Sequence, residues 1–204
     1  MSHEPHPFQP DDRVPTTEHE LVGVALRELL IEKGVFSADD ERRKIEELQA
    51  ASPANGARIT AHAWVDDSFR ERLLVDADAA IAELGFDAGF PLVVLANTPE
   101  VHNVVVCTLC SCYPRALLGP QPAWYKQAAY RSRVVYEPRA VLSEFGLSIA
   151  PEREVRVHDS TAELRYMVLP LRPSGTSGWS EERLAELVTR DALIGVAEAR
   201  EPSA

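Results

Sequence analysis

All three cysteines of the chain lie in one short stretch, Cys107-Thr108-Leu109-Cys110-Ser111-Cys112. Cysteines that serve only as small buried hydrophobes would be scattered along a chain of 204 residues. The C-x-x-C-x-C spacing instead lets three sulfur atoms meet at one point, which indicates a metal or redox centre. The fold must therefore hold this stretch as a compact loop.

The commoner thiolate sites each lack a part in this sequence. A structural zinc site or an iron–sulfur cluster normally uses four protein ligands, and there is no fourth cysteine. A histidine could complete a zinc site, but the nearest one, His102, lies off the usual spacing. A c-type haem needs histidine where Ser111 stands, and a disulfide would close a very small loop. A zinc-binding or metal-carrier protein without catalytic activity remains an alternative.

Residues Cys107–Cys112 form a compact claw, in which Cys110, Ser111 and Cys112 are consecutive. A metal held by the sulfurs would also lie against the amide nitrogens of Ser111 and Cys112, which could then lose their protons. Three thiolates and two amidates favour a trivalent low-spin ion of iron or cobalt over divalent zinc. Five donors on an octahedral ion leave one open position, which is typical of a catalytic site.

The stretch Val106–Cys112 resembles the claw of the α subunit of nitrile hydratase, in the form that carries cobalt. Further blocks resemble the same family in the same order: Trp124–Lys126, Tyr130–Val135, Glu137–Arg139, Thr161–Pro170 and Gly178–Glu182. The resemblance extends from the region of Thr17 to that of Gly195.

The resemblance implies a role for each residue of the claw. Cys107 would be the axial thiolate, Cys110 and Cys112 the equatorial sulfurs, and the amides of Ser111 and Cys112 the nitrogen donors. In the family the residues that match Cys110 and Cys112 are oxidised to sulfinic and sulfenic acid. Thr108 matches the residue of cobalt-type members, so the implied cofactor is a non-corrin Co(III), with Fe(III) as the alternative. The implied enzyme is a lyase that hydrates nitriles to amides, with Cys112, Cys110 and Ser111 as its catalytic residues.

The resemblance also implies partners. A β subunit would supply arginines to the oxidised sulfurs, in an α2β2 heterotetramer, and an activator or metallochaperone would load the metal. Glu163 and Arg165 are candidates for support around the ligands, and Arg131 and Arg133 for the subunit interface. The closest alternative is the cobalt subunit of thiocyanate hydrolase, which carries the same claw.

Two segments depart from the family pattern. Arg115-Ala116 stands where many members have Trp-Pro, and Pro120-Gln121-Pro122 stands where they have Leu-Pro-Pro. The tryptophan belongs near the substrate pocket in the family, so the preferred nitriles are left open.

Charge and hydropathy exclude some classes of partner. The formal charge is 21 − 32 = −11, which argues against nucleic acid or an anionic membrane as the partner. The N-terminus lacks the features of a signal peptide, and Arg27 and Glu28 interrupt the apolar run Leu21–Ile31, so we expect no membrane span. Clustered thiols without a secretory signal point to the cytoplasm.

Residues 1–55 are expected to form a helical arm that gains its burial on a partner subunit. A capping box of Thr17 and Glu20 begins one helix, which ends at Gly34, and Ser37 begins a second. The break Ser52–Gly56 would mark the boundary. A helical hairpin on the same domain is the alternative.

Residues 56–204 are expected to form the catalytic metal-binding domain, of α+β class. We expect a helix over 66–85, strands over 91–96 and 101–106, a short helix from Pro138, strands over 154–158 and 164–169 joined by a turn, and a helix over 180–195. The sequence thus predicts a layered α/β/β/α domain with mixed strands, whose metal claw is a loop at a strand end.

Overall fold

The structure is a computed structural model that describes residues 17–202. It divides into two compact units, residues 1–46 and 47–204. Residues 1–16 of the predicted arm lie outside the described residues. The predicted boundary after residue 55, and the packing of the arm on a partner, remain predictions.

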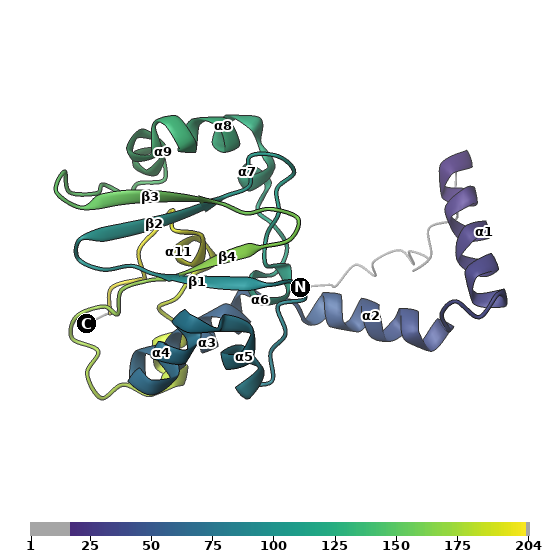
Figure 1. Cartoon of the computed structure of the whole chain (residues 1–204), viewed down its shortest axis with the longest axis horizontal. Helices are drawn as coiled ribbons and strands as arrows, with labels where there is room; N and C mark the ends of the chain where they lie inside the picture. The colour runs from purple at the N-terminus through teal and green to yellow at the C-terminus, as the bar shows by residue number, and fades with distance from the viewer. Residues whose placement is uncertain (1–16, 203–204) are drawn as a thin grey trace, which may run out of the picture. The chain divides into compact units, whose positions relative to one another are not determined.

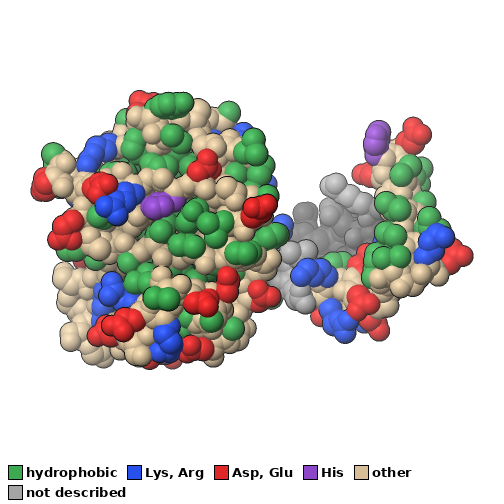
Figure 2. Space-filling view, viewed as in Figure 1, with side chains coloured by type: hydrophobic (Ala, Val, Ile, Leu, Met, Phe, Trp, Pro, Cys, Tyr) green, Lys and Arg blue, Asp and Glu red, His purple; other side chains and the backbone are tan. Residues whose placement is uncertain are grey.

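The first unit contains α1 (Glu18–Glu32) and the start of α2 (Ala38–Ala50). The predicted capping box is confirmed, because the Glu20 amide donates to Thr17 Oγ1 at 3.2 Å and Glu20 Oε2 accepts from the Thr17 amide at 2.9 Å. None of the α1 side chains is buried. Several large apolar side chains of α1 are therefore exposed to solvent (Figure 2), namely Leu21, Val22, Val24, Leu26 and Leu29.

The second unit contains α3 (Pro53–Val65), where the sequence suggested only a break. The Ser52 hydroxyl accepts from the Ala54 amide, and Pro53 takes the first turn, where its missing N–H costs nothing. Ile59 is fully buried. Turn-forming residues at 52–56 therefore mark a helix start.

The helix predicted over 66–85 is two helices, α4 (Asp67–Val75) and α5 (Ala77–Glu83). Asp76 adopts an extended conformation, and its carboxylate accepts from the Ala79 amide at 3.1 Å. The chain therefore starts a new helix at Asp76, while the apolar residues Phe69, Leu73 and Ile81 all remain buried.

The four strands found in the described residues form two parallel pairs. They are β1 (Leu92–Ala96), β2 (Val101–Val106), β3 (Glu154–Asp159) and β4 (Arg165–Leu169). In these pairs β1 lies beside β4 with Leu92 opposite Arg165, and β2 lies beside β3 with Val106 opposite Asp159. Consecutive strands β3 and β4 thus pair with different partners.

Helices cover both outer sides of these strands (Figure 1). Helices α8 (Ala128–Tyr136) and α9 (Pro138–Glu144) lie on the β3 side, and α3, α4 and α5 lie on the β1 side. The short helices α6 (Arg115–Leu118) and α7 (Ala123–Lys126) follow the claw. The predicted α+β class and the predicted helix at Pro138 are confirmed.

The helix predicted over 180–195 is also divided, into α10 (Glu181–Ala185) and α11 (Arg190–Ile194). Thr189 caps α11, and Gly195 ends it with φ +90°. A Cβ atom on Gly195 would lie 2.0 Å from the Asn103 carbonyl oxygen, so the end of α11 packs directly against β2. Across the described residues, no helix has the length and apolar character needed to cross a membrane.

Candidate metal centre

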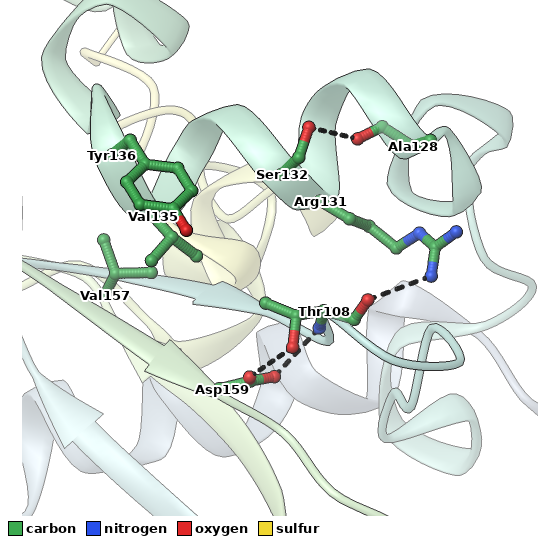
Figure 3. A pocket seen from close by; sticks show the side chains of 8 residues that line it. All are labelled: Thr108, Ala128, Arg131, Ser132, Val135, Tyr136, Val157 and Asp159. Atoms are coloured by element: carbon green, nitrogen blue, oxygen red, sulfur yellow. Dashed lines mark hydrogen bonds between the residues drawn. The ribbon is translucent and has the colours of Figure 1, made fainter.

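Strand β2 carries the chain into the claw. Val106 and Cys107 are fully buried, and the chain leaves the strand at Cys107. Val106 lies opposite Asp159, the last residue of β3. The end of β3 therefore lies next to Thr108 of the claw. The Asp159 carboxylate accepts from the Thr108 amide at 2.9 Å and from the Thr108 hydroxyl at 2.6 Å (Figure 3). The claw is therefore a loop at a strand end, as predicted.

The three sulfur atoms converge. Cys110 Sγ lies 3.7 Å from Cys107 Sγ and 3.1 Å from Cys112 Sγ, and all three lie within 4.8 Å of one another. Within residues 17–202 this is the one group of three or more His, Cys, Asp or Glu side chains with such spacing. Cys107 is buried, Cys112 is half-buried and Cys110 is exposed.

The backbone of the claw presents nitrogen to the same point. Ser111 has φ +70° and is the only non-glycine with positive φ in the part of the chain that the structure describes. The Cys110 amide donates to Cys107 Sγ at 3.3 Å. Burial raises the pKa of the Cys107 thiol, but the amides of Cys110, Cys112 and Leu109 donate to its sulfur and bring the pKa below the ordinary value.

The sulfurs of the claw differ in their electrostatic surroundings. Burial, and then hydrogen bonding with the thiols of Cys110 and Cys107, raises the pKa of Cys112 to about 12. The Arg165 guanidinium acts in the opposite direction. Arg165 is buried and lies over the Phe90 ring at 4.4 Å, and its predicted support of the ligands remains a prediction. Glu163, the other candidate, is exposed.

Three side chains within residues 121–131 donate hydrogen bonds to the carbonyl oxygens of the claw. Arg131 NH1 donates to the oxygens of Thr108 and Leu109 at 3.2 and 2.9 Å. Gln121 Nε2 donates to the Ser111 oxygen, and the Tyr125 hydroxyl donates to the Cys112 oxygen at 2.9 Å. Sequence reasoning missed the contacts of Gln121 and Asp159 because they depend on how distant segments pair.

The donor set fits a thiophilic ion that also accepts backbone nitrogen. Three sulfurs meet on one turn, and the Cys110 amide donates to one of them, Cys107 Sγ. The structure does not bring His102 to this point. His102 is buried elsewhere, with Nε2 2.7 Å from the Gly195 oxygen, so it does not complete a tetrahedral zinc site.

Other residues singled out in the sequence have structural roles. Trp124, Tyr125 and Tyr130 stack edge to face or tilted within the core. Arg133 pairs with Glu137 and Glu144 on the surface. A cavity of about 540 Å³ lies beside Thr108 of the claw (Figure 3), and it is lined by Thr108, Ala128, Arg131, Ser132, Val135, Tyr136, Val157 and Asp159. No claw cysteine lines this cavity.

Comparison with known proteins extends these observations to the whole chain. The family model described as nitrile hydratase, alpha chain, matches residues 17–197. The α subunit of the low-molecular-weight cobalt-containing nitrile hydratase of Rhodococcus rhodochrous is 52% identical over 183 residues, which cover 88% of each chain.

Two solved structures share the fold. A recombinant thiocyanate hydrolase with partially modified cobalt centres matches with a TM-score of 0.81 and 42% identity, covering 93% of this chain and 96% of that one. A double mutant of the iron-type nitrile hydratase of Comamonas testosteroni Ni1 matches with a TM-score of 0.78 and 44% identity, covering 92% and 94%.

Proposed function

The chain belongs to the nitrile hydratase α-chain family, and from that membership we propose that it is the metal-binding subunit of an enzyme that hydrates nitriles. The reaction adds one water to R–C≡N and gives the amide R–CO–NH2, which places the enzyme among the lyases. The convergence of three thiols within 4.8 Å, in a chain 52% identical to a cobalt-containing relative, carries this proposal.

Cobalt is the proposed ion. Its proposed ligands are the sulfurs of Cys107, Cys110 and Cys112 and the amide nitrogens of Ser111 and Cys112. A metal ion held there supplies Lewis acidity toward a nitrile or a water molecule. The chain itself fixes the ligands in position, through strand β2 on one side and the carbonyl contacts of Arg131, Gln121 and Tyr125 on the other.

Oxidation of Cys110 to sulfinic acid and of Cys112 to sulfenic acid is part of the proposal. The exposure of the sulfurs supports it, since Cys110 and Cys112 are accessible to an oxidant while Cys107 is buried. Cys107 would remain an unmodified thiolate. Cys112, Cys110 and Ser111 are the proposed catalytic residues.

A partner subunit is also proposed. The exposed apolar side chains of α1 support a role for the arm in packing on a β subunit, within an α2β2 assembly. Exposed apolar surface of this kind marks interaction sites in soluble proteins. Loading of the ion by an activator and a cytoplasmic location complete the proposal, and both rest on the sequence alone.

Co-expression with the β subunit tests the function. The purified complex should contain stoichiometric cobalt, carry added oxygen on the Cys107–Arg115 peptide, and form amide from a simple nitrile. Cys112→Ala should abolish amide formation and lower the cobalt content. Undiminished amide formation by Cys112→Ala, or zinc on unmodified thiols in the wild-type complex, would refute the proposal.

Hydrolysis of thiocyanate is the second candidate, and Arg115 is the residue that favours it. Arg115 is exposed at the start of α6, three residues beyond Cys112, and it forms no ion pair with a carboxylate within residues 17–202. A free cation near the claw would attract an anion such as thiocyanate more strongly than a neutral nitrile.

Turnover of both substrates separates the two candidates. We expect amide from neutral nitriles to be the main product. Arg115→Leu should weaken the binding of thiocyanate, as substrate or competitor, and leave neutral nitriles unaffected. If the wild-type complex releases carbonyl sulfide and ammonia from thiocyanate and leaves nitriles intact, the second candidate replaces the first.

A further inference from the structure

The peptide unit that joins Ser111 to Cys112 is held on both of its sides. Its carbonyl oxygen, on Ser111, accepts a hydrogen bond from Gln121 Nε2. Its N–H, on Cys112, is one of the backbone amides that lower the pKa of the Cys107 thiol, so it lies on the side of that sulfur. A trans peptide is planar, so its C=O and N–H point in opposite directions. A bond that fixes the oxygen on the outside therefore fixes the nitrogen toward the sulfurs.

The conformation of Ser111 makes this support necessary. Its φ of +70° lies in the left-handed region, which is unfavourable for a residue with a Cβ atom. The Ser111 hydroxyl donates only to the neighbouring Cys110 oxygen, a local contact that does not anchor the turn to the rest of the fold. Rotation of the 111–112 peptide would turn its oxygen toward the sulfurs and its nitrogen away.

Gln121 reaches Ser111 from a rigid loop. It lies between Pro120 and Pro122, whose rings fix φ on both sides of it. Arg190 NH1 donates to the Pro120 oxygen at 3.2 Å, and the Pro122 oxygen accepts from the Tyr125 amide at 3.1 Å. The backbone of Gln121 is thus fixed before its side chain forms the hydrogen bond. This lowers the conformational entropy that is lost when the bond to Ser111 forms.

We propose that Gln121 is a positioning residue of the metal centre, whose side-chain amide orients the Ser111–Cys112 peptide so that the Cys112 nitrogen faces the three sulfurs. Gln121 acts through the Ser111 carbonyl. The role in metal binding rests on the proposed function, whereas the orientation of the peptide is a property of the metal-free chain. The two can therefore be tested separately.

The test uses two variants and one matched control in the full-length chain. Gln121→Leu removes the donor, and Gln121→Glu keeps the shape of the side chain but presents an acceptor to the carbonyl oxygen. Gln127→Leu makes the same change at an exposed glutamine just before α8, whose side chain does not cap that helix. The thermal unfolding of each variant reports whether its fold is retained.

Hydrogen exchange in the metal-free chain is the first measurement. Loss of one hydrogen bond should make the Cys112 amide exchange roughly threefold to tenfold faster in both Gln121 variants. The second measurement is the sulfur-to-cobalt charge-transfer absorption of the complex with the β subunit. The absorption maximum should shift in both variants, because the nitrogen no longer faces the metal in one fixed orientation, and it should not shift in Gln127→Leu.

Each outcome decides the inference. Faster exchange and a shifted band in both Gln121 variants, with wild-type behaviour of Gln127→Leu, support it. Wild-type exchange and absorption in either folded Gln121 variant overturn it, and Gln121→Glu decides if Gln121→Leu fails to fold. If the wild-type complex holds no cobalt, the proposed function fails, and the exchange rates still decide the role of Gln121.

Discussion

At the scale of single residues, the contact between Thr108 and Asp159 joins the claw to the neighbouring strand. The carboxylate accepts two hydrogen bonds from one residue, at 2.9 and 2.6 Å (Figure 3). Both residues are exposed, so water weakens each bond relative to a buried one. The value of the contact lies in fixing the first turn of the claw against β3.

Thr108→Val keeps the shape of the side chain and removes its hydroxyl. We expect a loss of about 0.5–1 kcal/mol in the free energy of unfolding, the usual contribution of one hydrogen bond. Urea titration measures the change. Thr108→Ser retains the hydroxyl and should lose less than Thr108→Val, so equal losses in the two variants would show that the hydroxyl contact has no energetic role.

The convergence of the three cysteines could be predicted from the sequence, whereas the residues that hold the claw in place could not. Three cysteines at fixed spacing are visible in any reading of the chain. Asp159 contacts Thr108 only because β2 and β3 pair in one register, and Gln121 reaches Ser111 only because the loop before α7 folds back. Such contacts depend on tertiary placement, which local sequence does not encode.

At the scale of elements, the sequence predicted most segments but not their ends. The helix start at Ser52 looked like a break because Pro53 and Gly56 are common in turns. Gly56 has a packing role here, since a Cβ atom would lie 2.7 Å from Leu193 Cδ1. Asp76 and Thr189 divide two predicted helices because each caps a new helix while the apolar pattern continues across it.

The close approach of α11 to β2 gives a prediction at this scale. In Gly195→Ala the new Cβ atom would lie 2.0 Å from the Asn103 oxygen, and the φ of +90° is itself unfavourable for alanine. β2 or the end of α11 must move. We expect a loss of about 3 kcal/mol or more in the free energy of unfolding, which combines overpacking with backbone strain.

Gly175→Ala is the matched control for this substitution. Gly175 has φ +75° but open space around its Cβ position, so only the backbone term remains, about 1 kcal/mol. Urea unfolding of both variants measures the difference. Since β2 leads directly into Cys107, Gly195→Ala should also lower the cobalt content of the complex. A Gly195→Ala protein as stable as Gly175→Ala would contradict the packing of α11 on β2.

At the scale of the whole second unit, a polar network joins the C-terminal segment to the strands that lead to the claw. Glu198 Oε1 lies 2.6 Å from Arg153 NH1 and 3.5 Å from His102 Nδ1. His102 belongs to β2, and Arg153 immediately precedes β3. Arg153 Nε also donates to the Thr98 oxygen. The network thus connects three segments that lie far apart in the sequence.

This network makes stability depend on pH. Burial raises the pKa of Glu198, but its contacts with His102 and Arg153 outweigh burial and bring the pKa below its ordinary value. The unfolded chain therefore binds this proton at a higher pH than the folded chain does. The stabilisation is fully present above about pH 4.3, the pKa of a free glutamate, and is lost as the pH falls through the folded-state pKa.

Glu198→Gln removes the titrating group and keeps the shape of its side chain. At pH 7 we expect a loss of about 1 kcal/mol in the free energy of unfolding. The expected loss is smaller than for a fully buried ion pair, because the Glu198 side chain is 35% exposed and water screens its charge. Below about pH 4.3 the wild type should lose stability more steeply than Glu198→Gln, so the two curves of urea midpoint against pH should converge. Glu152→Gln, an exposed glutamate before β3, should follow the wild-type curve. Parallel curves for wild type and Glu198→Gln would show that the C-terminal segment is not held by the charge of Glu198.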